Sequence, residues 1–175
     1  LIISSCGDKH KEIVKEEKLP NIVYVLADDL GIGDIHAFNP DGKINTPNID
    51  RLAQEGMKFT DAHTSSAVCT PTRYGILTGR YNWRSPLKSG VLTGVSKALI
   101  PNSRTTVASL LKKANYTTAF IGKWHLGWDW ALKEGDSVGG TGWNPTDYAN
   151  IDFAKPITNG PNDLGFDYAY GFSGS

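Results

Sequence analysis

A nearly continuous apolar run, NIVYVLA from Asn21 to Ala27, ends abruptly at two adjacent acids, Asp28 and Asp29. Its length and its β-branched and aromatic content predict a strand that is buried on both faces. Two carboxylates at the end of a buried strand are costly unless something compensates their charge. This junction therefore predicts a buried strand whose end carries two acids that need a compensating partner.

Three later segments carry the sequence signals of helices. Residues 45–56 (NTPNIDRLAQEG) and 69–81 (CTPTRYGILTGRY) each contain a Thr-Pro start and a closing glycine, which makes Thr46 and Thr70 the expected N-caps. Residues 105–116 (TTVASLLKKANY) place Val107, Leu110, Leu111 and Ala114 at helical spacing, which predicts an amphipathic helix.

Short strands are expected after the first and after the third of these helices, at 57–60 and at 117–121; the second of these strands, TTAFI, runs directly into GKWH. The order strand, helix, strand, helix, strand predicts an α/β layered domain with a largely parallel central sheet flanked by helices. Ligands bind beyond the carboxyl ends of such strands. Since the Asp pair and the GKWH cluster each follow a predicted strand, we expect them to meet in space.

The Asp pair is a candidate site for a hard cation. Ca²⁺, or alternatively Mg²⁺, prefers oxygen ligands, and no Cys/His spacing for zinc accompanies the pair. Solvated or capping acids at a strand end are the common alternative, so Asp28 and Asp29 alone are a weak signal.

Cys69 is one of only two cysteines, and Arg73 follows it by four residues. A helix N-terminus favours an anion, and Arg73 adds a fixed charge with forked donors. This turn therefore has the chemistry of a reactive group beside an oxyanion pocket. A buried structural cysteine, a disulfide with Cys6 and a plain thiolate nucleophile are the alternatives.

Lys123 and His125 are the candidate polar groups of the GKWH cluster. Strand alternation would place them on the same side, with Trp124 opposite. Lysine offers a point charge to an anion, and histidine exchanges a proton near neutral pH. For an isolated pair, a surface lysine and a hydrogen-bonded core histidine would be the simpler interpretation.

Four stretches together resemble the sulfatase family. CTPTRYGILTGR resembles the signature C-x-P-[ST]-R before a short helix that ends in T-G-R. NYTTAFIGKWH resembles the second signature, although Asn115 stands where glycine is usual. NIVYVLADDLGIGD and TPNIDRLAQEG resemble the first metal-binding strand and another common segment. The resemblance runs from about Pro20 to the end and implies an alkaline-phosphatase-like fold.

The resemblance implies hydrolysis of sulfate esters, with sulfated carbohydrates as the expected substrates. In the family a maturation enzyme converts the signature cysteine, here Cys69, to formylglycine. One hydroxyl of the hydrated aldehyde attacks sulfur and the alcohol leaves; the second hydroxyl then loses its proton, and collapse to the aldehyde expels sulfate. Arg73 would hold the formylglycine side chain, and Asp28 and Asp29 would ligate calcium.

The same resemblance assigns the substrate side of the site. Lys123 would bind sulfate, and His125 would position the diol or deprotonate it. Ser175 resembles a serine that contacts sulfate in some relatives. Family members take further metal ligands and another His and Lys from later in the chain, so we expect these 175 residues alone to be inactive.

Two other functions remain as alternatives. A phosphomonoesterase or phosphodiesterase of the same superfamily would use a Ser or Thr nucleophile and usually zinc, and Cys69 argues against it. A catalytically inactive glycan-binding lipoprotein would not need the full set of motif residues. The presence of the full set argues against this alternative. Equal numbers of basic and acidic residues, 18 of each, argue against a nucleic-acid partner.

The first 18 residues read LIISSCGDKHKEIVKEEK and begin with Leu1 rather than Met. They resemble the end of a bacterial lipoprotein signal, with Cys6 as the lipidated residue and membrane anchor; a cloning remnant is the alternative. We expect residues 1–18 to be a signal remnant and charged tether, residues 19–175 to be the N-terminal part of the catalytic domain, and both ends to be cuts. The protein would be exported, to the periplasm or the outer membrane of a bacterium.

Tryptophans and a basic aromatic stretch are candidates for sugar contact. They are Trp128 just before a long Gly- and Asn-rich loop from 129 to 163 that we expect to be ordered, Trp130 and Trp143 within that loop, and RYNWRSPLKSGVL after the first signature. A loop of this length is usually functional, although packing is the expected role of any single tryptophan.

Overall fold

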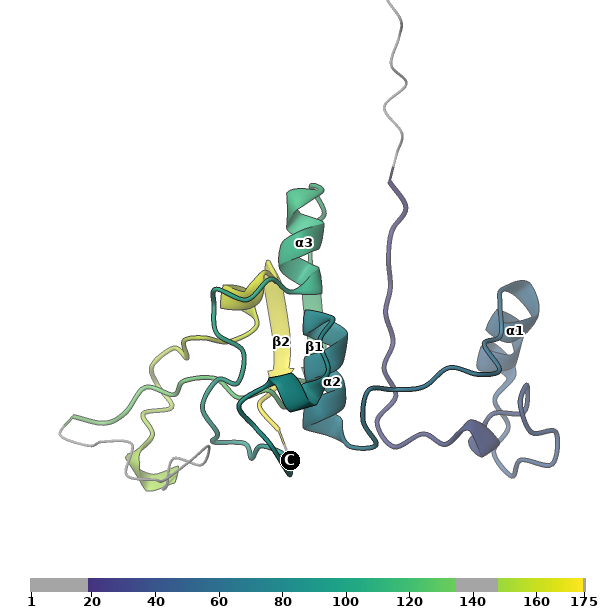
Figure 1. Cartoon of the computed structure of the whole chain (residues 1–175), viewed down its shortest axis with the longest axis horizontal. Coiled ribbons are helices and arrows are strands. Elements are labelled where there is room, and N and C mark those ends of the chain that lie inside the picture. Colours follow the sequence, from purple (N-terminus) through teal and green to yellow (C-terminus); the bar gives the residue numbers. More distant parts are fainter. Residues whose placement is uncertain (1–18, 135–147, 175) are drawn as a thin grey trace, which may run out of the picture. The chain divides into compact units, whose positions relative to one another are not determined.

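The computed structural model describes residues 19–134 and 148–174. The chain divides into two compact units, Leu1–Gln54 and Glu55–Ser175. Helices η1 (Ile32–Asp34) and α1 (Pro47–Glu55) come first along the chain, and α1 confirms the helix expected after Thr46. The second unit carries the elements that follow α1 (Figure 1), which are α2 (Cys69–Thr78), η2 (Asn82–Arg84), α3 (Val107–Lys113), β1 (Ala119–Lys123), η3 (Tyr148–Asn150), η4 (Asn162–Leu164) and β2 (Tyr168–Phe172).

Strands β1 and β2 pair in parallel, with Ala119 opposite Tyr168 and Lys123 opposite Phe172 (Figure 1). Gly122 and Gly171 face each other in this register, and a Cβ on Gly171 would lie 1.8 Å from the carbonyl oxygen of Gly122. Only glycine therefore fits at Gly171. The parallel pairing confirms the expected type of sheet and brings the carboxyl ends of the two strands together.

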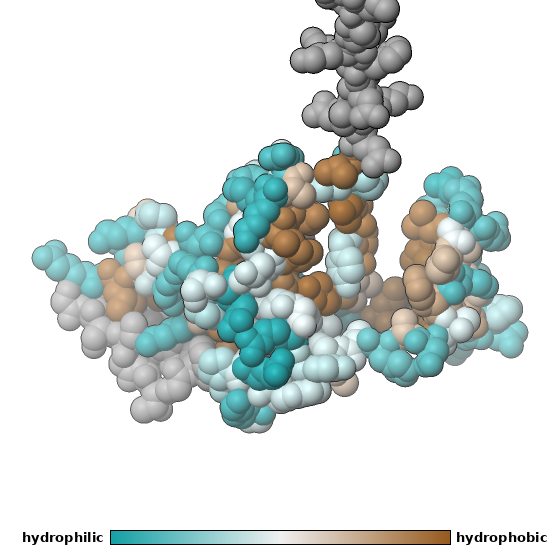
Figure 2. Space-filling view, turned by 45° about the horizontal axis from the view of Figure 1, so that its top comes forward, coloured by the Kyte–Doolittle hydropathy of each residue, from teal (hydrophilic) through white to brown (hydrophobic). Residues whose placement is uncertain are grey.

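Two of the predicted strands, at 21–27 and at 57–60, both among the described residues, do not form in the structure. Both predictions are therefore wrong. Residues 21–27 have no regular secondary structure, and Val23 and Val25 are 86% and 84% exposed. Residues 57–60 are likewise irregular, with Met57 and Phe59 exposed. Apolar surface is correspondingly visible in the space-filling view (Figure 2). The sequence pattern favours extended backbone, but a ladder also needs a neighbouring strand to pair the backbone N–H and C=O groups.

Helix α3 forms where predicted, but its buried side differs from the expected stripe. Val107 and Leu110 are 42% and 58% exposed, whereas Ala108 is buried and Leu111 is half-buried. Thr106 caps the helix by accepting a hydrogen bond from the Ser109 amide at 3.1 Å. Helical spacing predicts which residues share a face, while the elements that pack nearby decide how much of that face is buried.

The core of the second unit surrounds the residues that follow β1. Trp124 is 1% exposed, and its ring meets Phe120 and Phe166 edge-to-face at centroid distances of 5.1 and 6.3 Å. Its Nε1–H donates to the Gly127 carbonyl at 2.9 Å, so the buried polar group is satisfied. The other buried members of the cluster are Tyr74, Leu92, Leu99, Ile100, Leu126 and Leu164.

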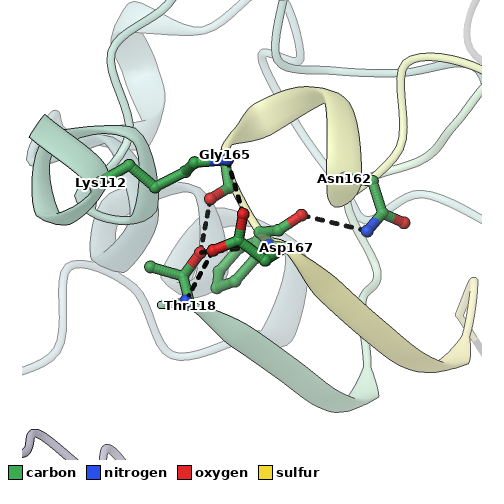
Figure 3. A network of polar contacts seen from close by, with 6 residues as sticks. Lys112, Thr118, Asn162, Gly165 and Asp167 are labelled. Atoms are coloured by element: carbon green, nitrogen blue, oxygen red, sulfur yellow. Dashed lines mark hydrogen bonds and ion pairs between the residues drawn. The ribbon is translucent and has the colours of Figure 1, made fainter. Parts of the chain in front are cut away.

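A polar network joins the end of α3 to the beginnings of both strands (Figure 3). The Asp167 carboxylate accepts from the Lys112 ammonium at 2.6 Å and from the Thr118 amide at 2.9 Å. The Asp167 amide in turn donates to the Thr118 carbonyl at 2.9 Å. The network thus helps to fix the register in which β1 and β2 pair, and so brings their carboxyl ends side by side.

Asp167→Asn in the full-length protein is expected to lower stability at neutral pH more than in acid. The Lys112 ammonium, helped by the Thr118 amide, holds the pKa of Asp167 below its usual value. A carboxyl with a lower pKa in the folded state adds stability above its unfolded pKa, and this contribution disappears as the pH falls through the folded pKa. Urea unfolding midpoints should therefore differ at pH 7, and the difference should shrink as the pH falls below about 4, the ordinary pKa of an aspartate.

Asp152→Asn is the matched control, because Asp152 also pairs with a lysine, Lys155, at 3.4 Å. That pair is an i,i+3 contact within a single loop, and such surface pairs contribute little. A gap between wild type and Asp167→Asn that stays constant from neutral to acid pH would contradict the assigned role of the carboxylate.

The connection between β1 and β2 confirms the expected long ordered loop in its described parts. Antiparallel bridges pair Asp129 with Thr158 and Leu132 with Ile151, and η3 and η4 lie within it. Among residues 19–134 and 148–174, no helix is long and apolar enough to span a membrane.

Candidate active site

Cys69 is the first residue of α2, and it is a half-buried free cysteine. Val68 is the N-cap, in extended conformation (φ −131°, ψ 162°), and it makes no side-chain capping hydrogen bond. The expected cap at Thr70 is therefore wrong by two residues. Pro71 is the third helical residue, where its missing N–H is tolerated because N–H groups of the first turn have no partner within the helix.

Glycines shape both the middle and the end of α2. A Cβ on Gly75 would lie 2.3 Å from Ser65 Oγ, so this glycine permits the preceding segment to pack closely against the helix. Gly79 ends α2 with a left-handed backbone (φ 64°), and its amide donates to the Gly75 carbonyl. The end of the helix predicted at the closing glycine is therefore confirmed.

Arg73 connects α2 to the end of β1. Its Nη1 donates a hydrogen bond to the Lys123 carbonyl oxygen. Cys69 and Arg73 are four residues apart and so share a face of the helix. The structure thus brings the CTPTR turn beside the GKWH segment, although the two are about fifty residues apart in the sequence.

His125 is buried, at 1% exposed, and is held in an unusual conformation. Its backbone is left-handed (φ 54°), which is uncommon for a residue other than glycine. Its amide donates to the Ser173 carbonyl at 2.7 Å, and its Nε2 lies 2.7 Å from the Leu92 carbonyl. Strained backbone that the surroundings hold in place concentrates at functional sites.

The expected alternation of Lys123, Trp124 and His125 along one strand is wrong. Strand β1 ends at Lys123, which is half-buried, and the left-handed turn at His125 interrupts the two-residue period. Trp124 and His125 are consequently both buried, although Trp124 still donates its amide to the Phe172 carbonyl at 2.9 Å.

Asn115 stands where the second signature usually has glycine, and its backbone conformation shows why asparagine can replace glycine there. It has a left-handed backbone (φ 64°) just after α3, and its amide donates to the Lys112 carbonyl at 3.0 Å. Glycine adopts this conformation freely, and asparagine is among the few other residues that tolerate it. Asn115 therefore preserves the turn that leads into β1.

Asp28 and Asp29 belong to the first unit and are exposed. Asp29 has a left-handed backbone (φ 58°) at the bend after residues 21–27. Within the described ranges, no group of three or more His, Cys, Asp or Glu residues could hold a metal. Two carboxylates fit the chemistry of a hard cation but supply only part of the six to eight oxygens that Ca²⁺ takes.

Some expected site residues lie outside the described ranges. They are Cys6, Trp143 and Ser175. Conversely, the structure adds two positions that the motifs did not single out. A Cβ on Gly174 would lie 2.7 Å from His125 Cδ2, so glycine is required against the ring. The Leu92 backbone reaches the same ring from the end of the stretch RYNWRSPLKSGVL, for which only sugar contact was expected.

The described aromatic residues separate into a packed group and an exposed pair. Trp130 meets Trp128 and Phe153 edge-to-face at 5.4 and 5.3 Å, so these tryptophans pack within the loop. Tyr81 and Trp83 stack at 4.1 Å with an interplanar angle of 11°, and they are 55% and 59% exposed.

Comparison with known proteins gives matches along nearly the whole chain. The family model described as Sulfatase matches residues 20–174. The N-acetylgalactosamine-6-O-sulfatase of Bacteroides thetaiotaomicron is 39% identical over 170 residues, which cover 97% of this chain and 30% of that protein. The steryl-sulfatase of Homo sapiens is 50% identical over 113 residues, covering 62% of this chain and 19% of that protein.

Solved structures give the same match. A structure from work on the metabolism of multiple glycosaminoglycans by Bacteroides thetaiotaomicron has 40% identity and a TM-score of 0.73, covering 89% of this chain and 28% of that chain. The crystal structure of Ps i-CgsB in complex with k-i-k-neocarrahexaose has 31% identity and a TM-score of 0.62, covering 85% and 27%. These likenesses confirm the expected α/β class, and this chain spans less than a third of the relatives described here.

Proposed function

This chain belongs to the sulfatase family, and from that premise we propose that the full-length protein hydrolyses sulfate esters with a nucleophile made from Cys69. The observation that carries the proposal is the joining of the CTPTR turn to the GKWH segment. The Arg73 guanidinium binds the Lys123 carbonyl, and the Thr70 hydroxyl binds the His125 carbonyl at 2.9 Å. The test is sulfate release from an aryl sulfate by the full-length protein, coexpressed with a formylglycine-generating maturation enzyme.

The reaction needs a nucleophile with a built-in route for release. Conversion of Cys69 to formylglycine and hydration of the aldehyde would supply two hydroxyls on one carbon. The first attacks the sulfur of the ester, and the alcohol departs; deprotonation of the second expels sulfate and restores the aldehyde. An ordinary serine or thiol has no second hydroxyl and would remain sulfated.

The surrounding residues then have complementary roles. Arg73 lies one helical turn after Cys69. Its fixed positive charge would hold the formylglycine side chain. Lys123, at the end of β1, would bind the sulfate group as a point charge. His125 would take the proton of the second hydroxyl. Ser175 follows the described segment 168–174 and would add a contact to sulfate.

A divalent cation, which we propose to be Ca²⁺, would be held in part by Asp28 and Asp29. Their carboxylates match the ligand chemistry, and further ligands are required to complete the shell. When bound, the ion would polarise the sulfate ester and favour the ionised form of the attacking hydroxyl.

We propose sulfated carbohydrates as the substrate class. Two relatives support this, since one is an N-acetylgalactosamine-6-O-sulfatase and another was solved with k-i-k-neocarrahexaose. The segment 80–88 (RYNWRSPLK) contains three basic residues and no acid, which suits a polyanionic chain. The exposed stack of Tyr81 and Trp83 lies in the same segment and would suit a sugar ring.

Trp83→Ala in the full-length protein is expected to raise KM for a sulfated oligosaccharide by roughly two- to tenfold, the worth of one aromatic contact. The kcat/KM for a small aryl sulfate should stay within twofold, since that substrate does not reach beyond the sulfate site. Trp83→Phe keeps an aromatic face and should behave like wild type. Equal effects of Trp83→Ala on both substrates would contradict the assignment.

We propose that the full-length protein is an exported lipoprotein anchored through Cys6. The sequence LIISSCG supports this, because small residues precede the cysteine at the end of an apolar run. Metabolic labelling of a bacterial host with a lipid analogue should label the wild-type protein and leave Cys6→Ser unlabelled. An unlabelled wild-type protein would contradict the anchor.

A further inference from the structure

Thr70 occupies a position in CTPTR to which the signature assigns no role, yet its side chain is completely buried. Its hydroxyl donates to the His125 carbonyl at 2.9 Å and accepts from the Leu92 amide at 3.2 Å. A threonine hydroxyl has one hydrogen and two lone pairs, so it satisfies both contacts at once. One side chain thus connects three segments that lie far apart in the sequence.

Leu92 closes these contacts into a ring. Its amide donates to Thr70, and its carbonyl lies 2.7 Å from His125 Nε2. A carbonyl oxygen only accepts, so Nε2 must carry the hydrogen of this bond. In the neutral imidazole the proton-accepting lone pair is then on Nδ1. The Leu92 contact therefore selects one of the two tautomers of His125.

We propose that Thr70 is a positioning residue for the reaction proposed above, on which this inference rests. Its hydroxyl places the His125 backbone beside the turn that carries Cys69, and through Leu92 it keeps the imidazole in the Nε2–H tautomer. His125, Leu92 and Thr70 are each no more than 1% exposed, so water does not compete for these bonds.

The left-handed backbone of His125 explains why these hydrogen bonds are needed. A left-handed histidine is unfavourable in isolation and persists only where its surroundings fix it. The Ser173 carbonyl holds the amide of His125, Thr70 holds its carbonyl, and Leu92 holds its ring. Without the Thr70 hydroxyl, the carbonyl of His125 and the amide of Leu92 would be buried without that partner.

Thr70→Val keeps the shape of the side chain and removes the hydroxyl. In the full-length protein, we expect kcat for an aryl sulfate to fall about 10- to 100-fold, as for a small misplacement of a reacting group, with KM within twofold. Thr70→Ser should restore kcat to within about threefold of wild type. Rates are expressed per converted Cys69, counted by peptide mass, so that altered maturation is not mistaken for altered catalysis.

Thr106→Val is the matched control, since the buried Thr106 hydroxyl likewise donates to a distant carbonyl, that of Leu164, and accepts from an amide, that of Ser109. It removes a hydroxyl of similar structural value without touching His125, and its kcat should remain within about threefold of wild type. A Thr70→Val enzyme with wild-type kcat, or a Thr70→Ser enzyme as slow as Thr70→Val, would overturn the proposal.

The histidine tautomer gives a readout that does not require activity. Nitrogen-15 NMR of full-length protein labelled at histidine, with His125→Gln for assignment, should show Nε2–H in wild type and a mixture of tautomers in Thr70→Val. Wild-type protein with the proton on Nδ1, or an unchanged tautomer in Thr70→Val, would overturn the positioning role. A wild-type protein with no sulfatase activity would instead count against the proposed function. The tautomer of His125 could still be measured in that case, so the two failures are distinguishable.

Discussion

Cys69→Ala in the full-length protein is expected to lower turnover of an aryl sulfate by about 10⁴-fold or more. Alanine cannot be converted to an aldehyde, so both the attacking hydroxyl and the hydroxyl that expels sulfate are lost. Cys69 is half-buried at the start of α2, and substitution by a smaller side chain there should leave the helix intact. The measurement is steady-state sulfate release, with circular dichroism to confirm that the variant is folded.

Cys69→Ser separates attack from release. A serine hydroxyl in the same place can attack sulfur, but it has no second hydroxyl with which to expel the sulfate. The variant should release at most one alcohol per enzyme and retain sulfate on the introduced serine, which mass spectrometry detects. Sustained turnover by Cys69→Ala or by Cys69→Ser would contradict the proposed nucleophile.

Asp29→Asn is expected to weaken Ca²⁺ binding by more than the 10- to 100-fold typical of residues that only support a metal ligand. The substitution removes a charge while keeping a residue that tolerates the left-handed backbone at this position (φ 58°). Asp29→Ala would add backbone strain to the loss of the ligand, and it should therefore destabilise the protein as well. Calorimetric titration of the full-length protein with Ca²⁺ measures the affinity directly.

Activity provides the second half of this test. If Asp29 holds the ion, sulfate release by Asp29→Asn should recover in part as Ca²⁺ is raised, and the concentration needed should follow the measured affinity. Asp34→Asn is a suitable control, because Asp34 is engaged locally with the Gly31 amide at 3.0 Å. Unchanged Ca²⁺ affinity in Asp29→Asn would remove the carboxylate from the metal site.

The helices could be predicted from the sequence because their signals are local. A Thr-Pro start, a closing glycine and helical spacing lie within a dozen residues, and α1, α2 and α3 all form at those places. The cap of α2 was misplaced because Thr70 looks like a capping residue by composition. In the structure its hydroxyl is directed instead to His125 and Leu92.

Features that depend on contacts between distant parts of the chain cannot be predicted from local sequence patterns. A strand at 21–27 depends on which neighbour pairs with it, and the sequence of the segment alone does not specify that partner. The left-handed turn at His125 replaces the alternation that GKWH suggested. The contact of His125 with Leu92 joins residues 33 positions apart, and only sugar contact was expected of the stretch that ends at Leu92.

The candidate site could be proposed residue by residue only because several weak signals coincide. A cysteine before proline, an Asp pair after an apolar run or a Lys-x-His sequence is ambiguous alone. Their joint spacing points to a single chemistry, and the structure places the CTPTR turn against the end of β1. The contacts of Thr70 that order this turn follow from three-dimensional proximity and were not predictable.

The most direct test of the central claim is the mass of the peptide that contains Cys69, from full-length protein coexpressed with a maturation enzyme. The proposal predicts that this peptide has the lower mass of the formylglycine form, that hydrazide reagents capture its aldehyde, and that the converted fraction tracks sulfatase activity across preparations. An unmodified thiol in every preparation, with no sulfate released from an aryl sulfate, would contradict it.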